Sequence, residues 1–176
     1  MKNVRKYEYY TNESLLEKLI DEFGEMVKRL AYTYVKDWQV AEDITQEVFL
    51  ACYNNLENFR EECSYKNWIY KITINKCKDF IKGKWILPKE FLERLFMNEN
   101  KRSITPEDRL MLLTEERILS QNVLKLPVKY REIIILYYYE DLKIKEISEL
   151  TGLNEATIKT RLSRGKKFLR KIYEGG

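Results

Sequence analysis

The sequence predicts an all-α protein of two small helical domains, the second of which carries a helix-turn-helix. The first reason is composition, because only three Pro and six Gly interrupt 176 residues rich in helix formers. The second is periodicity, since apolar residues recur at helical spacings and alternating strand patterns are hard to find. The third is a break in this pattern, from which we expect domains at residues 1–84 and 106–176 and a linker at 85–105.

Composition limits the chemistry that the chain can perform. Hydrophobic residues make up 44% and charged residues 34%, which is typical of a soluble globular protein. Cysteines at positions 52, 63 and 77 form no CxxC pair, so we expect neither a disulfide frame nor a zinc site. Histidine, the commonest acid–base group and metal ligand, is absent. We therefore expect no catalytic residues, no metal and no cofactor.

Charge and hydropathy indicate where the chain acts. No apolar run approaches the roughly 18 residues of a membrane span, and the start, MKNVRKYEYYTNE, lacks the apolar segment of a secretion signal. We expect a cytoplasmic protein. The net charge is only +4, but residues 37–62 carry seven acids and one base, whereas residues 66–84 carry six lysines and one acid. An acidic surface is therefore followed along the chain by basic ones.

The second helix carries a surface that its own core does not need. A first helix, expected from about Asn12 to Tyr34, has an ordinary packing face, and the second is expected from about Trp38 to Leu56. Beside its apolar stripe the second helix has a mixed face of Glu42, Gln46, Phe49, Leu50, Tyr53 and Glu57. This face suits a protein partner of basic and apolar character. It equally suits packing beneath the first helix or the linker, and the residues leave both interpretations open.

A third helix follows the polar loop at residues 58–66 and combines aromatic residues with lysines. The residues concerned are Tyr65, Trp68, Tyr70, Lys71, Lys78, Lys82 and Lys84. Bases stack on aromatic rings while lysines follow the phosphate backbone, so this combination suits single-stranded nucleic acid. Taken alone, it is more often explained by aromatic residues in the core and lysines in water.

The C-terminal part is expected to be helical and to end in a helix-turn-helix. Helices are expected at Glu90 to Met97, at about Pro106 to Lys125 and at Pro127 to Tyr139. The first helix of the motif has an apolar stripe of Ile144, Ile147 and Leu150. Gly152 can adopt the left-handed backbone that ends this helix, and Asn154 is a good N-cap for the next.

The second helix of the motif separates apolar from basic residues. At about 100° per residue, one line holds Ile158, Leu162, Gly165, Leu169 and Ile172. The opposite side holds Thr160, Ser163, Arg164, Lys167 and Lys171. Such a face suits the major groove of DNA, where short polar residues and Arg reach base edges and Lys neutralises phosphate. A solvated basic face on a helical hairpin is the alternative, but the Gly-turned helix before it favours DNA binding.

Three segments stand in a specific order and spacing. They are AEDITQEVFLACYNNLENFR at 41–60, NWIYKITINKCKDFIK at 67–82, and LPVKYREIIILYYYEDLKIKEISELTGLNEATIKTRLSRGKKFLRK at 126–171. Together they resemble the extracytoplasmic-function (ECF) group of bacterial RNA polymerase sigma factors. The resemblance implies two helical domains on a flexible linker, without catalytic activity, that bring RNA polymerase to specific promoters and help to open the DNA.

The resemblance also assigns roles to individual residues. The polymerase β′ clamp helices would dock on Glu42, Asp43, Gln46, Glu47 and Leu50. The −10 element and its flipped base would meet Phe59, Ser64, Tyr65, Trp68, Lys71, Asn75 and Lys78. The −35 element would meet Lys159, Thr160, Arg161, Ser163, Arg164 and Lys167. The chain departs from the family at Lys143, where a Ser or Thr cap is common, so this helix start is expected to fray.

The implied partners are proteins and DNA. They are core RNA polymerase, through its β′ clamp helices and β flap, double- and single-stranded promoter DNA, and an anti-sigma factor, soluble or membrane-bound; the chain itself would not insert into a membrane. A stand-alone helix-turn-helix regulator is an alternative, but such proteins usually dimerise and nothing in the sequence resembles a dimer interface. A metal-dependent nucleic-acid enzyme fits less well, because Glu42, Asp43 and Glu47 spread over more than about 100° of helix without His support.

Overall fold

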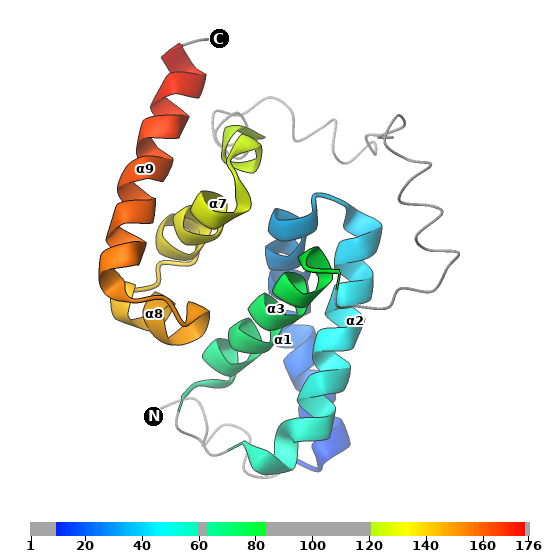
Figure 1. Ribbon diagram of the computed structural model, residues 1–176. Coiled ribbons are helices and arrows are strands. Elements are labelled where there is room, and N and C mark those ends of the chain that lie inside the picture. The colour runs from blue at the N-terminus through cyan, green and yellow to red at the C-terminus, as the bar shows by residue number, and fades with distance from the viewer. Residues whose placement is uncertain (1–9, 60–62, 84–120, 175–176) are drawn as a thin grey trace.

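The computed structural model describes residues 10–59, 63–83 and 121–174, and every regular element within these ranges is helical (Figure 1). The elements are α1 (Asn12–Val35), α2 (Trp38–Asn55), η2 (Leu56–Asn58), α3 (Tyr65–Ile81), α7 (Val128–Ile134), η3 (Ile135–Tyr139), α8 (Ile144–Thr151) and α9 (Glu155–Glu174). This confirms the all-α prediction. The predicted linker at 85–105, the short helix at Glu90 to Met97 and most of the helix at Pro106 to Lys125 lie outside the described residues.

The helices of the N-terminal unit, α1 to α3, begin at side chains that accept hydrogen bonds from the first turn. Thr11 Oγ1 accepts from the backbone N–H of Ser14 at 3.3 Å, and Ser64 Oγ accepts from that of Asn67 at 3.2 Å. Asp37 Oδ1 accepts from two N–H groups of α2, at 2.9 and 3.0 Å. Each cap satisfies donors that the helix itself leaves unpaired. The helix starts are thus encoded locally.

Helix α3 packs on more than one side, which explains why its apolar residues form no strict stripe. It contacts α1 and α2 within the N-terminal unit and α8 of the C-terminal unit (Figure 1). Its buried residues are Tyr65, Ile69, Tyr70, Thr73, Ile74 and Cys77. For Tyr65 and Tyr70 the plainer interpretation, aromatic residues in the core, is the one that the structure bears out.

The C-terminal unit, residues 121–174, contains the predicted helix-turn-helix, α8 and α9. Gly152 ends α8 in the left-handed conformation, at φ 73°, and Asn154 Oδ1 caps α9 by accepting from the N–H of Thr157 at 2.7 Å. Both predictions are confirmed. The expected fraying at Lys143 is wrong. The side chain of Glu146, three residues into the helix, caps its start instead, because its carboxylate accepts a hydrogen bond from the Lys143 N–H at 2.9 Å.

Helix α9 approaches α7 closely at Gly165. A Cβ on residue 165 would lie 3.0 Å from Cγ1 and 3.2 Å from Cδ1 of Ile134, whose side chain is 2% exposed. The two helical units then lie against each other, with α3 beside α8 and α1 beside α7 (Figure 1). Across the described residues, no helix is both long enough and apolar enough to cross a membrane.

Substituting Gly165 by Ala tests this close approach, with Gly24→Ala in α1 as the matched control. A Cβ at residue 24 would have its nearest neighbour at 3.9 Å. Both changes gain up to about 1 kcal/mol of helix propensity. Only Gly165→Ala crowds buried atoms, which typically costs about 1–3 kcal/mol. Urea unfolding followed by circular dichroism should give Gly165→Ala the lower free energy of unfolding, and equal stabilities would mean that Ile134 moves aside without cost.

Candidate nucleic-acid and protein interfaces

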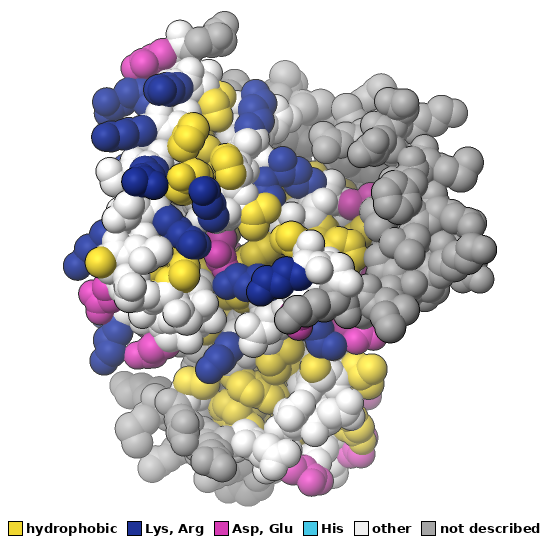
Figure 2. All heavy atoms as spheres, in the orientation of Figure 1, with side chains coloured by type: hydrophobic (Ala, Val, Ile, Leu, Met, Phe, Trp, Pro, Cys, Tyr) yellow, Lys and Arg dark blue, Asp and Glu magenta, His cyan; other side chains and the backbone are white. Residues whose placement is uncertain are grey.

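The basic face of α9 is exposed along most of its length. The exposed members of the predicted duplex-contacting set are Lys159, Thr160, Ser163, Arg164 and Lys167. They face solvent because Ile158, Leu162 and Gly165, on the opposite side, are buried. Figure 2 shows Lys and Arg side chains gathered along the side of the molecule where α9 runs. The arrangement leaves short polar and basic side chains free to reach a groove and its phosphates.

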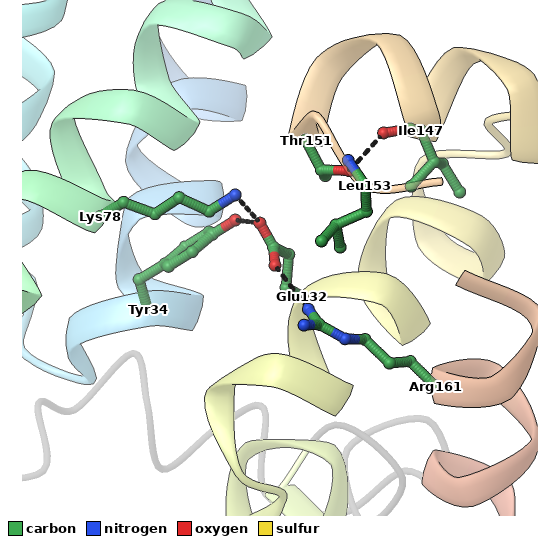
Figure 3. A network of polar contacts seen from close by, with 7 residues as sticks. All are labelled: Tyr34, Lys78, Glu132, Ile147, Thr151, Leu153 and Arg161. Atoms are coloured by element: carbon green, nitrogen blue, oxygen red, sulfur yellow. Dashed lines mark hydrogen bonds and ion pairs between the residues drawn. The ribbon is translucent and has the colours of Figure 1, made fainter. Parts of the chain in front are cut away.

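Arg161 is the exception on this helix. Its side chain is 25% exposed, and its Nη1 lies 4.0 Å from Oε2 of Glu132, a residue of α7. Because Arg161 directly precedes the buried Leu162, it sits at the flank of the basic face and turns inward toward α7 (Figure 3). The structure therefore separates it from the other predicted −35 residues.

Three aromatic side chains gather where α2 leads into α3. The ring centroid of Phe59 lies 4.4 Å from that of Tyr65 and 5.0 Å from that of Trp68. Ser64 starts α3 as its N-cap, so its hydroxyl has a structural partner. Phe59 and Trp68 are half-buried and present ring surface on which a base could stack. Residues 60–62 of the predicted loop lie outside the described residues.

The polar members of the predicted −10 set form a row along α3 and do not join the aromatic cluster. Asn75 is exposed and lies on the same face as Trp68, but two helical turns farther on, about 10 Å away. Lys71, also exposed, stands between them. Lys78 continues the row by one turn, and its Nζ lies 2.9 Å from Oε1 of Glu132. Along the helix axis the ring cluster and Asn75 are thus separate, at a spacing that suits successive nucleotides of one strand.

A shallow groove runs between α1 and α2. It has a volume of about 450 Å³ and is lined by Leu16, Ile20, Glu42, Thr45, Gln46, Phe49, Leu50 and Tyr53. Leu50 is 54% exposed and Ile20 42%, so large apolar side chains meet solvent here. Phe49, in contrast, is buried at the base. A contiguous apolar surface with a polar rim is typical of a protein-binding site.

The groove divides the residues predicted to bind polymerase. Glu42, Gln46 and Leu50 line it, whereas Asp43 and Glu47 are not among its lining residues. Glu47 lies on the flank toward α3, where its Oε2 accepts a hydrogen bond from Lys76 Nζ at 3.1 Å. Glu42 pairs with Lys28 of α1. The acidic surface is thus broader than the groove, and part of its charge is already paired within the chain.

Glu132 joins the two units, and the sequence analysis missed it. Its side chain is only 4% exposed; its Oε1 accepts a hydrogen bond from the Tyr34 hydroxyl of α1 at 2.7 Å, in addition to facing Lys78. Burial, followed by the nearby Glu132 charge, raises the pKa of Tyr34 well above its ordinary value, so the hydroxyl stays protonated and donates. The usable signal was a pair of charged residues, Arg131 and Glu132, inside the otherwise apolar run from Tyr130 to Leu136.

Two further contacts tie the units together. The buried guanidinium of Arg131 donates from Nη1 to the carbonyl oxygens of Leu124 and Leu126, at 2.7 and 3.0 Å, and from Nη2 to that of Tyr34 at 3.2 Å. The Tyr70 hydroxyl of α3 donates to the carboxylate of Glu140. Burial and this hydrogen bond raise the pKa of Tyr70, which keeps its proton available for donation.

Comparison with known proteins adds family information to this geometry. A family model described as Sigma-70 region 2 matches residues 19–86, and one described as Sigma-70, region 4 matches residues 117–169. The first match spans the groove except for Leu16, the aromatic cluster and the row along α3. The second spans α7, α8 and most of α9.

Individual relatives agree with the two family matches. The chain is 31% identical over 162 residues to the ECF RNA polymerase sigma factor SigW of Bacillus subtilis, covering 87% of this chain and 86% of that protein. It is 34% identical over 163 residues to the RNA polymerase sigma factor SigV of the same organism, covering 91% and 92%. The fold resembles the sigma factor RpoE from Bartonella quintana, solved with the anti-sigma factor NepR, at a TM-score of 0.69, 16% identity and coverage of 90% and 96%.

Proposed function

The chain belongs to the extracytoplasmic-function group of RNA polymerase sigma factors, and we propose on this premise that it binds core RNA polymerase, directs it to specific promoters and helps to open the DNA. The observation that carries the proposal is the coexistence of three separate surfaces: the groove of α1 and α2, the row along α3 and the basic face of α9. The groove would meet protein, whereas the row along α3 and the basic face of α9 would meet nucleic acid.

The groove and its acidic flank are the proposed docking surface for the polymerase β′ clamp helices. Leu50, with its large exposed area, would be the apolar anchor, and Glu42 and Gln46 would supply polar contacts at the rim. Asp43 and Glu47 would extend the negative surface and favour a basic partner.

The DNA-binding surfaces would act at different promoter elements. Phe59 and Trp68 would form the stacking wall for an unpaired base of the −10 element, with the buried Tyr65 packed against Phe59, while Lys71, Asn75 and Lys78 would follow the strand along α3. The exposed face of α9 would enter the major groove at the −35 element. Tethering both to one polymerase raises their effective concentration on the same DNA without any new contact.

We propose a docking and melting domain at residues 1–84, a linker at 85–105 and a −35-reading domain at 106–176. The chain would work in the cytoplasm, without a cofactor or catalytic activity of its own, and would answer to an anti-sigma factor. The likeness in fold to RpoE, which was solved with such a partner, supports the last point.

Run-off transcription tests the function directly. The purified chain, added to core polymerase with a library of promoter fragments, should co-elute with the core enzyme and direct transcription from a defined subset. Core polymerase alone is the control, and transcription independent of the added chain would contradict the proposal.

The docking surface can be tested with Leu50→Ala. Removing an exposed apolar anchor should weaken binding to core polymerase by roughly tenfold, about 1.4 kcal/mol, without changing helicity. Ile81→Ala is the matched control, because Ile81 is a comparably exposed apolar residue, at 47%, that does not line the groove. Equal affinities for the two variants, measured by fluorescence anisotropy, would place the docking surface elsewhere.

Arg164 and Lys171 separate base reading from phosphate binding at the −35 element. Arg164→Ala should cost about 1–3 kcal/mol on the cognate duplex and relax the preference at one position, if the guanidinium binds a base edge. Lys171→Ala should weaken all duplexes alike and lower the salt slope by about one. Binding to cognate and scrambled duplexes at several salt concentrations makes the distinction, and equal losses on both duplexes for Arg164→Ala would refute base reading.

Asn75→Ala tests the role of α3 in strand opening. Because Asn75 is exposed, its truncation should leave the fold intact while removing an amide that can both donate to and accept from a base edge. Permanganate reactivity of the −10 region should fall more than closed-complex affinity does. A promoter pre-melted by mismatches should restore much of the loss, whereas unchanged opening on the intact promoter would exclude Asn75 from the −10 surface.

A further inference from the structure

The turn between α8 and α9 is held by two side-chain hydroxyls of α8. Thr151 Oγ1 accepts a hydrogen bond from the backbone N–H of Leu153 at 3.3 Å and donates one to the carbonyl oxygen of Ile147 at 2.6 Å (Figure 3). Ser148 Oγ donates to the carbonyl oxygen of the same Leu153 at 2.6 Å. Both polar groups of the Leu153 backbone are therefore bound to the last turn of α8.

Leu153 is the residue through which α8 can direct the start of α9. It directly follows Gly152, at φ 73°, and directly precedes Asn154, the N-cap of α9. Because glycine permits many backbone conformations, the turn alone does not fix the direction of the chain that leaves it. Buried apolar residues such as Ile147 and Ile158 hold the two helices together. Apolar burial is not directional, however, whereas a hydrogen bond is.

The direction of α9 matters because its exposed face has to meet base edges. Thr160 lies roughly 10 Å along the helix from Leu153, so a tilt of about 10° would move it by about 2 Å. A hydrogen bond to a base edge does not survive such a shift, whereas attraction to phosphate falls off gradually with distance. A loosened turn should therefore weaken the reading of sequence more than the general attraction to DNA.

We propose that Ser148 and Thr151 are positioning residues, whose hydroxyls fix the direction of α9 and thereby determine how strongly the chain prefers its own −35 sequence over others. The proposal rests on the proposed reading of the −35 element by α9. Both residues lie on α8 and are half-buried, outside the exposed face of α9. They act on DNA binding through the backbone of Leu153.

Spin-label distances test the geometry without reference to function. Labels at Lys145→Cys and Tyr173→Cys occupy exposed positions on α8 and near the end of α9. The exposed Cys63 is replaced by Ser so that it takes no label. Cys52 and Cys77 stay unlabelled at neutral pH, because burial raises the pKa of each thiol to about 12.

Removal of either hydroxyl should broaden the distribution of these distances. Ser148→Ala and Thr151→Val are the test variants, and Thr151→Ser, which keeps the hydroxyl, should stay narrow. Thr33→Val is the matched control, because Thr33 Oγ1 likewise donates to a backbone carbonyl, that of Leu30 in α1, at 2.6 Å. If one test variant loses helicity by circular dichroism, the other decides. Distributions as narrow as that of wild type would overturn the proposal.

Selectivity for the −35 element tests the consequence. The unlabelled chain is assembled with core polymerase, and closed-complex affinity is measured on two promoter fragments that differ only in a cognate or scrambled −35 sequence. Ser148→Ala and Thr151→Val should lower affinity for the cognate fragment by roughly three- to tenfold and leave that for the scrambled fragment unchanged. Thr151→Ser and Thr33→Val should keep the ratio of wild type.

The ratio of the two affinities separates positioning from stability. A loss of stability alone would lower both affinities alike, and that result, or an unchanged ratio, would overturn the proposal. Failure of the proposed function would appear in the wild-type chain instead, as equal affinities for the two fragments beside an intact change in spin-label distances.

Discussion

From Tyr130 to Ile134, helix α7 is buried on every side, and the arrangement of the other helices depends on packing and pairing these residues. Its buried residues are Tyr130, Arg131, Glu132, Ile133 and Ile134. Ile134 packs against α9, where Gly165 allows the two backbones to come close. The two charged residues cannot stay unpaired at that depth, so Arg131 takes backbone carbonyls and Glu132 takes partners from α1 and α3. One helix thus positions α9 and joins the two units.

Features that depend on a few neighbouring residues could be predicted from the sequence. The end of α8 at Gly152 and the start of α9 at Asn154 follow from backbone and capping chemistry within one turn. The buried side of α9 follows equally directly from a spacing of three and four residues. The capping of α8 was not predicted, because a Ser or Thr was expected at Lys143 and the carboxylate of Glu146 takes its role instead.

Features that depend on which helix lies opposite could not be predicted. The mixed face of α2 left two interpretations open, packing within the chain and binding of a partner. Its residues are divided in the structure, because Phe49 is buried whereas Leu50 beside it is exposed. Along α3, lysines of the same type differ in their surroundings, because Lys71 is exposed while Lys78 meets Glu132. Periodicity places Arg161 near the basic face of α9, yet the carboxylate that turns it inward lies 29 positions earlier in the chain.

The contact between the two units includes buried polar groups, and this chemistry determines how it responds to salt. An apolar interface of similar extent would gain strength from burial alone and would be little affected by salt. Ion pairs in water weaken as salt rises, but a carboxylate that is 4% exposed, such as Glu132, is screened much less. Salt should therefore weaken phosphate binding by exposed lysines and arginines more than it weakens the pairs of Glu132. The contact between the units and the basic face of α9 consequently differ in their response to ionic strength, because the charges of the first are buried and those of the second lie in water.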